Sequence, residues 1–97
     1  MNDMSAVINN VEAMEALIST IESVSKKLDE QNNTLAAAYD AAKQKWTDGK
    51  STEFAEVLSS IRSSIEKASK DLEVSASKLS TMKDFLEEYL KVSFLKL

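Results

Sequence analysis

Adjacent acidic residues are the side chains of this sequence that could bind a metal ion or move a proton. They occur as the pairs Asp29–Glu30 and Glu87–Glu88. Neighbouring residues on a helix diverge by about 100° around its axis, so two adjacent carboxylates do not converge on one ion. The chain has no His, which removes the commonest general base and the helical Glu-x-x-His metal pattern. We therefore interpret both pairs as solvated helix surface.

Serine is the most abundant candidate nucleophile. Serines are frequent in the second half of the chain, at Ser59, Ser60, Ser63, Ser64, Ser75 and Ser77. A serine hydroxyl needs a neighbouring base before it attacks a substrate. The amines of Lys70 and Lys78 are available, but no pattern in the sequence buries them. Because Cys is also absent, thiolate chemistry and disulfides are excluded. We expect no enzymatic activity, no catalytic or metal site and no cofactor.

The composition is that of a protein made of long helices. Of 97 residues, 43% are hydrophobic and 6% aromatic, with one Gly and no Pro. The net charge is −4, and acidic and basic residues alternate without a basic cluster, so we expect no nucleic-acid partner. The N-terminus carries Asn2 and Asp3 where a signal peptide would be basic, and the apolar runs are short. We expect neither a cleaved signal peptide nor stable membrane insertion.

Residues 46–54 divide the chain near its midpoint and contain its only Trp and its only Gly. We predict one helical-hairpin domain over residues 1–97, with a helix at about 4–46, a turn at about 47–50, a helix at about 51–92 and a short C-terminal tail. Asp48 can cap the second helix, and Gly49 permits a close approach or a positive φ. The predicted fold class is all-α, an antiparallel two-helix hairpin that pairs into a four-helix bundle as a dimer. The turn motif comprises Trp46, Asp48, Gly49 and Phe54.

Both predicted helices carry residues at alternating steps of four and three, the heptad spacing of a helix–helix seam. In the first helix this seam comprises Val7, Val11, Met14, Ile18, Ile21, Ser25, Leu28, Asn32, Leu35, Tyr39, Ala42 and Trp46. In the second it comprises Phe54, Leu58, Ile61, Ile65, Ala68, Leu72, Ser75, Leu79, Met82, Leu86 and Tyr89. If Trp46 faces Phe54, the numbers of facing residues add to about 100. Ser25 is then expected opposite Ser75.

Further apolar residues lie beside these seams and are candidates for binding a partner. They are Leu17, Val24, Val57, Val74, Phe85, Leu90 and Phe94. Two helices enclose about one seam each, so we favour partner contact over an ordinary intrachain core. Around Phe94, either the helix continues or a binding segment begins. Trp46 is interpreted as a seam residue that closes the hairpin tip, with a recognition role as the alternative.

Residues 46–54 resemble the turn of the WXG family, the ESAT-like small helical hairpins of type VII (ESX) secretion systems in Gram-positive and mycobacterial bacteria. Members of that family are about 100 residues long, with Trp-x-Gly at the turn and often a large apolar residue in the next helical turn. Trp46 matches the Trp of that motif and Phe54 matches the later residue. Asp48 stands at the place of the family's Gly, and Gly49 follows one position later.

The resemblance implies an exported substrate or a co-secreted helical partner, which is cytoplasmic first and then secreted without a cleaved signal peptide. Its implied partners are a second copy, a related small helical protein or an exported toxin, and the secretion machinery. Secreted members often carry Tyr-x-x-x-Asp/Glu after the second helix, whereas Ser93 follows Tyr89 by four residues here. The alternative is therefore a cytoplasmic adaptor or targeting chaperone that binds the helical N-terminal domain of a larger secreted toxin. A third reading is a generic coiled-coil interaction module.

Overall fold

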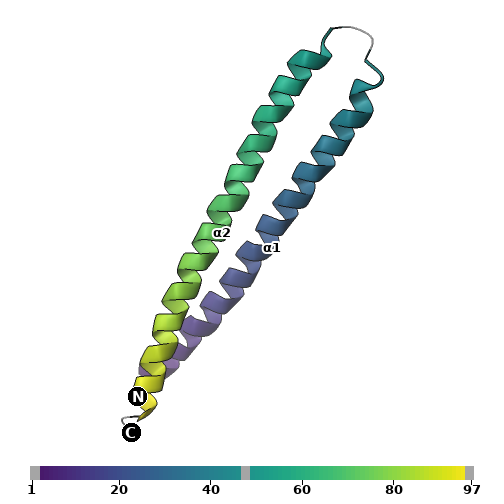
Figure 1. The fold of residues 1–97 in the computed structure, drawn as a ribbon. Coiled ribbons are helices and arrows are strands. Elements are labelled where there is room, and N and C mark those ends of the chain that lie inside the picture. Colours follow the sequence, from purple (N-terminus) through teal and green to yellow (C-terminus); the bar gives the residue numbers. More distant parts are fainter. Residues whose placement is uncertain (1–2, 47–48, 96–97) are drawn as a thin grey trace. The chain divides into compact units, whose positions relative to one another are not determined.

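The computed structural model describes residues 3–46 and 49–95, with the side chains of residues 5–46 and 49–92. Within these ranges the chain forms two helices and no strand: α1 is Asp3–Lys43 and α2 is Ser51–Leu95. The helices run in opposite directions on either side of the turn (Figure 1). The predicted all-α helical hairpin is therefore confirmed.

The helix ends differ from the predicted bounds by about one turn. The first helix ends at Lys43, three residues before the expected end, and the Lys45 amide donates to the Ala42 carbonyl at 3.0 Å. The second helix begins at Ser51, as predicted, but continues to Leu95 through the expected tail. This continuation is consistent with the absence of Gly and Pro after residue 49. The expected cap, Asp48, lies outside the described residues.

Gly49 does not use the conformational freedom expected of it. Its φ is not positive, and a Cβ added at this position would meet no atom within 4 Å. The turn therefore places no steric demand for glycine at this residue.

The chain forms two compact units. The turn unit is Val24–Asp71, and the terminal unit combines Met1–Ser23 with Leu72–Leu97. Each unit pairs a stretch of α1 with an antiparallel stretch of α2.

A buried serine pair sets the helix register in the turn unit. Ser25 and Ser69 are each 3% exposed, and their hydroxyl oxygens lie 2.8 Å apart. The Ser25 hydroxyl also reaches the Ser69 carbonyl at 3.2 Å, and the Ser69 hydroxyl reaches the Ser25 carbonyl at 3.3 Å. The pair thus satisfies its own buried polar groups and lets the two backbones approach closely. The expected partner, Ser75, lies six residues further along the chain and is exposed.

A second polar contact has the same register. The Arg62 Nε donates to Asn32 Oδ1 at 2.8 Å. The residue numbers of both pairs, Ser25–Ser69 and Asn32–Arg62, add to 94. The predicted sum of about 100 is therefore wrong in the turn unit. Apolar side chains of similar size fit several registers, whereas these hydrogen bonds fit one.

The interior of the terminal unit is built from small and medium side chains. Val11 and Ala76 are its most deeply buried apolar residues. Lys83 lies half-buried, and its ammonium group is 2.8 Å from a Glu87 carboxylate oxygen and 4.0 Å from one of Glu15 on α1. The hydrogen bond to Glu87 raises the pKa of Lys83 above its ordinary value, against a smaller opposing effect of burial.

Candidate functional site

The face that α2 turns towards α1, called the inner line, follows steps of four and three without interruption. Its residues are Ser51, Ala55, Leu58, Arg62, Ile65, Ser69, Leu72, Ala76, Leu79, Lys83, Leu86 and Leu90, all buried or half-buried. Small residues occupy several of its positions. Arg62 and Lys83 lie on this line: Arg62 donates a hydrogen bond to Asn32 of α1, and Lys83 forms an ion pair with Glu15 of α1 and a hydrogen bond with Glu87 of α2. Their aliphatic stems can therefore cover the seam.

The structure places most of the expected seam between the helices. In α1, all twelve expected seam residues are buried or half-buried, among them Met14, Ile18, Ile21, Leu28, Leu35 and Tyr39. In α2, the half-buried residues of the expected seam are Leu58, Ile65, Leu72, Leu79 and Leu86.

At every second position, the inner line of α2 lies one residue after the expected seam residue. Ile61 and Met82 were expected inside but are 45% and 52% exposed. Arg62 and Lys83, the residues that follow them, take their places on the inner line. At these positions the predicted seam uses large apolar side chains such as Ile61 and Met82, whereas the structure places small or long-stemmed residues there. Leu90, expected to bind a partner, belongs to the inner line.

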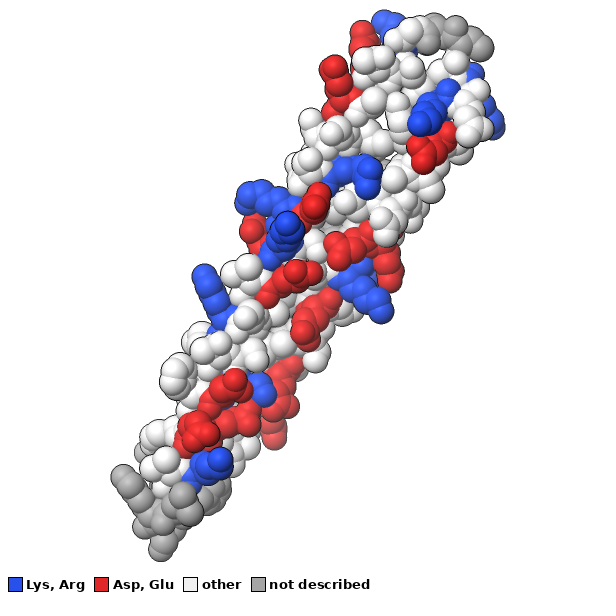
Figure 2. Space-filling view, viewed as in Figure 1, with Lys and Arg blue, Asp and Glu red and all other residues white. Residues whose placement is uncertain are grey.

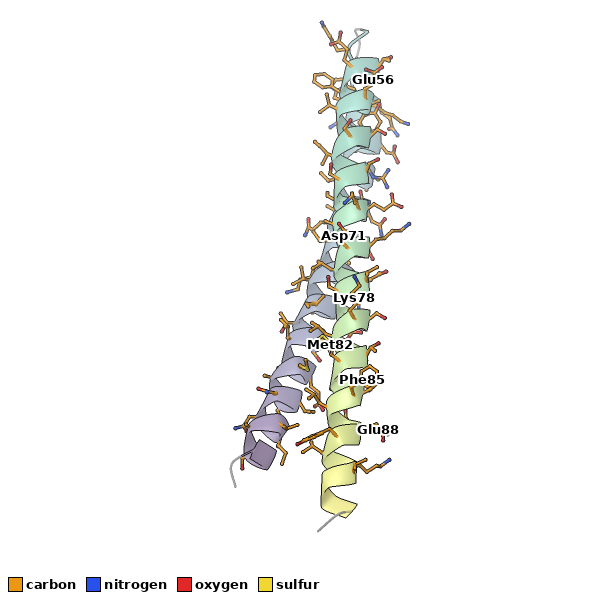
Figure 3. All side chains as sticks on the ribbon, turned by 90° about the vertical axis from the view of Figure 1, so that its left-hand side faces the viewer. Glu56, Asp71, Lys78, Met82, Phe85 and Glu88 are labelled. Carbon is orange, nitrogen blue, oxygen red and sulfur yellow. The ribbon has the colours of Figure 1, made fainter. Side chains whose placement is uncertain are left out.

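The displaced apolar residues form a second heptad pattern on α2, called the outer line. It comprises Phe54, Val57, Ile61, Ser64, Ala68, Asp71, Ser75, Lys78, Met82, Phe85, Tyr89 and Val92, all exposed. Phe85 is the most exposed large apolar residue at 72%. Figure 3 labels Met82 and Phe85 on α2, one turn apart along the helix.

The outer line is apolar at both ends and polar in its middle. In the turn unit its apolar residues are Phe54, Val57 and Ile61. In the terminal unit they are Met82, Phe85, Tyr89 and Val92. Between them lie Ser64, Ala68, Asp71, Ser75 and Lys78. The line could have been found in the sequence, because its members also alternate by three and four residues, one residue before the inner line.

The apolar flanks of the two helices lie on the same side of each unit. One residue corresponds to about 100° of rotation, so the residue preceding a seam position lies about a quarter-turn from the seam. Because α1 and α2 are antiparallel, this quarter-turn leads to the same side of both helices. Leu17 and Val24 precede seam positions of α1 and are 49% and 43% exposed. They therefore flank the same side as the outer line in their respective units.

A groove marks this apolar side in the turn unit. It has a volume of about 320 Å³, and residues of both helices line it. Ala38 and Tyr39 contribute from α1, and Phe54, Val57 and Ile61 from the outer line of α2. The groove is thus open and apolar, and it is lined by side chains of both helices of the turn unit.

The residues that follow the seam positions make the opposite side polar. On α1 they include Glu15, Glu22 and Asp29, and on α2 Glu66 and Glu73, all exposed. Figure 2 shows acidic and basic side chains interleaved on the face it views. The polar side therefore contrasts with the apolar side in each unit.

Three aromatic rings pack together at the turn. The Trp46 ring lies 4.8 Å from the Phe54 ring and 5.8 Å from the Tyr39 ring, centroid to centroid. The Tyr39 hydroxyl donates to the Ser51 carbonyl at 3.2 Å, which joins α1 to the first residue of α2. Trp46 is half-buried and Phe54 is 48% exposed. The turn motif thus closes the hairpin and also leaves aromatic surface at the start of the outer line.

The remaining expected site residues are placed as follows. Val57 and Phe85 are exposed on the outer line, and Val74 is 53% exposed on the side of α2 away from α1. The Phe94 side chain lies outside those that the structure describes. In the described ranges, no group of three or more His, Cys or acidic residues is placed to bind a metal ion. Neither helix, over its described residues, has a stretch long and apolar enough to cross a lipid bilayer.

Comparisons with protein-family models, with curated proteins and with solved structures gave no match. The assignment of a function therefore depends on the chain's own residues and geometry.

Proposed function

We propose that this chain is a non-enzymatic interaction protein of a type VII secretion system, of the WXG kind, that pairs into a four-helix bundle. It acts as an exported substrate or as the co-secreted helical partner of one. The observation that carries the proposal is the exposed outer line of α2, with Phe54, Ile61, Met82, Phe85 and Tyr89 all about half exposed or more. A stripe of this kind is typical of a helix that packs against a second chain.

The turn supports the resemblance to the WXG family on which this proposal rests. The two residues that carry the resemblance, Trp46 and Phe54, are in ring contact at 4.8 Å. They join helices of 41 and 45 residues, so the motif lies between arms of nearly equal length. A hairpin with its aromatic motif at the central turn is the layout that the resemblance implies.

Export is tested by measuring the protein inside and outside its native cells, with and without the ATPase of the associated secretion system. We expect the extracellular amount to fall at least tenfold in the deletion strain while the intracellular amount is maintained. An unrelated protein exported through the general pathway serves as the control. An unchanged extracellular amount, together with no binding to any exported protein, would contradict the proposal.

A cytoplasmic adaptor for a larger secreted toxin is the second candidate. Ser93 stands four residues after Tyr89, where many secreted members have an acidic residue, and this favours a chain that does not carry its own export signal. Co-expression with the products of neighbouring genes, followed by size-exclusion chromatography with light scattering, separates the two candidates. An adaptor forms a complex with a toxin domain and stays in the cell. A stable homodimer that ignores its neighbours speaks against it.

A further inference from the structure

We propose that a pocket around Arg62 in the turn unit binds a small zwitterion, an aliphatic α-amino acid. Its carboxylate pairs with Arg62 and its ammonium group pairs with Glu66. The inference is independent of the proposed function, because all the residues that line this pocket belong to the turn unit and none of them belongs to the outer line.

The Arg62 pocket has a volume of about 300 Å³ and is lined by both helices. From α1 it receives Asn32 and Tyr39. From α2 it receives Ala55, Leu58, Ser59, Arg62, Ser63 and Glu66. Pockets that bind small ligands begin at about this volume, and they combine apolar walls with a few polar groups. The Arg62 pocket has that composition, with one cation and one anion among its polar groups.

The cation of the pocket lacks a carboxylate partner. Arg62 is the only Arg of the chain, and it is one of two half-buried cations among the described side chains. The other, Lys83, is paired with Glu15 and Glu87. Arg62 donates its Nε–H to Asn32, but it forms no ion pair with any described carboxylate. The bond to Asn32 thus holds the guanidinium in place and leaves its other N–H groups for a ligand.

The groups beside Arg62 suit a carboxylate. A guanidinium presents parallel N–H groups that match the two oxygens of a carboxylate. Ser59 and Ser63 line the same pocket, and their hydroxyl groups form no hydrogen bond with other described residues. Ser59 lies three residues before Arg62 and four before Ser63, so the three side chains share one face of α2. Two hydroxyl donors therefore stand beside the guanidinium.

Glu66 adds the opposite charge to the pocket. It lies four residues after Arg62 and forms no ion pair with Arg62 or with any other described cation. An inorganic anion bound at Arg62 would lie near this carboxylate, and the repulsion would weaken its binding. A ligand with an ammonium group next to its carboxylate satisfies both charges. Side chains four apart on a helix have Cβ atoms about 5–6 Å apart, a span that the head group of an α-amino acid can bridge.

The charge of the turn unit favours neither sign of ligand. Val24–Asp71 contain eight acidic and eight basic residues, so their net charge is zero. A unit without net charge has no long-range field that would concentrate anions at the pocket. Selection therefore depends on Arg62 and Glu66 themselves, and together they match a ligand that has both charges and no net charge.

The apolar wall of the pocket indicates the kind of side chain that the ligand carries. Ala55, Leu58 and Tyr39 line the pocket together with the polar groups. They offer contact to a short aliphatic side chain and no further charged group. L-Valine has the zwitterionic head group and such a side chain, and it is therefore the probe for this site.

NMR titration of the full chain tests the site, because the single Arg gives a single guanidinium Nε–H signal. We expect L-valine to shift this signal saturably, with half-saturation at a concentration at least tenfold lower than for sodium acetate at the same ionic strength. Sodium phosphate should bind no better than acetate. Binding of acetate or phosphate as tight as that of L-valine would indicate a simple anion site and overturn the proposal. A signal that none of the three shifts saturably would show that the pocket binds no such ligand.

Substitutions assign the two charge contacts, with the backbone N–H signal of Ser63 as the common readout. Glu66→Gln should weaken L-valine binding at least tenfold without weakening that of acetate, because only the ammonium contact is lost. Arg62→Lys keeps the charge but removes the paired N–H groups, and it should weaken the binding of both ligands. Glu73→Gln is the matched control, since Glu73 is exposed on the polar side of α2 and does not line the pocket.

Glu66 is exposed, so Glu66→Gln decides the question even if Arg62→Lys fails to fold, which circular dichroism shows. Unchanged L-valine binding in Glu66→Gln, or an equal loss in Glu73→Gln, would overturn the proposed contacts.

Discussion

At the scale of residues, the buried Ser25–Ser69 pair decides how closely α1 and α2 approach in the turn unit. Each serine is almost fully enclosed and hydrogen-bonded to the other. A larger apolar residue at Ser25 would suit a generic heptad seam, yet it would not fit between backbones this close. The pair therefore buries less apolar surface than two leucines would, but it defines the register of the two helices.

Ser25→Leu should lower the free energy of unfolding by about 2–4 kcal/mol, since it overpacks the contact and removes a partner of the Ser69 hydroxyl. Urea unfolding followed by circular dichroism at a fixed protein concentration measures the change. The control is Ser77→Leu, at an exposed position of α2, with an expected effect within about 0.5 kcal/mol. A stabilised Ser25→Leu variant would contradict the observed register.

Two substitutions at Trp46 distinguish a structural role of this residue from a role in recognition. Its half-buried ring packs against Tyr39 and Phe54, so Trp46→Ala should destabilise the hairpin by about 2 kcal/mol. Trp46→Phe keeps a ring in place and should lose less than about 1 kcal/mol. Circular dichroism is the appropriate probe because the chain has no other Trp. Unchanged melting combined with failed export or partner binding would make Trp46 a recognition residue instead.

At the scale of elements, α2 differs from α1 in carrying two heptad patterns one residue apart. The inner line packs against α1, and the outer line is rotated by about a quarter-turn. A helix with two such faces can contact two neighbours at once, which is the situation of each helix in a four-helix bundle. The inner line is covered by α1 and the outer line is exposed, and this difference is the main structural argument that α2 binds a second chain.

The roles of the two lines can be distinguished by making the same Ile→Ser substitution on each line, in two separate variants. Ile65 lies half-buried on the inner line and Ile61 lies exposed on the outer line. Ile65→Ser should destabilise the hairpin by about 2–3 kcal/mol. Ile61→Ser should retain the helical circular dichroism spectrum but weaken self-association. Equal loss of folded structure in both variants would show that the outer line belongs to the intrachain core.

Much of this arrangement follows from sequence pattern. The single turn region and the seam of α1 were predictable because heptad spacing runs through that helix without a break. The inner line of α2 was predictable at Leu58, Ile65 and Leu72 but not at Ser69 or Arg62. Hydrophobicity favours Phe54 and Ile61 for the seam, whereas the fold uses small residues and side-chain hydrogen bonds there. Polar pairs of this kind are specified by backbone distance, which a single sequence does not show.

At the scale of the whole molecule, large apolar side chains of both helices are exposed, whereas Val11 and Ala76 are the buried apolar residues of the described ranges. Small domains have little interior and commonly depend on oligomerisation for stability. On α2 the exposed residues of the outer line follow a regular spacing in each unit. The proposed pairing with a second chain would cover these residues.

The molar mass of the wild-type chain in solution tests this central claim most directly. Size-exclusion chromatography with light scattering, at micromolar concentration and without any other protein, should give about twice the chain mass of 10.7 kDa. Phe85→Ser, at the most exposed position of the outer line, should shift the mass towards that of one chain while the helical spectrum is retained. A wild-type mass of one chain across the concentration range would contradict the account.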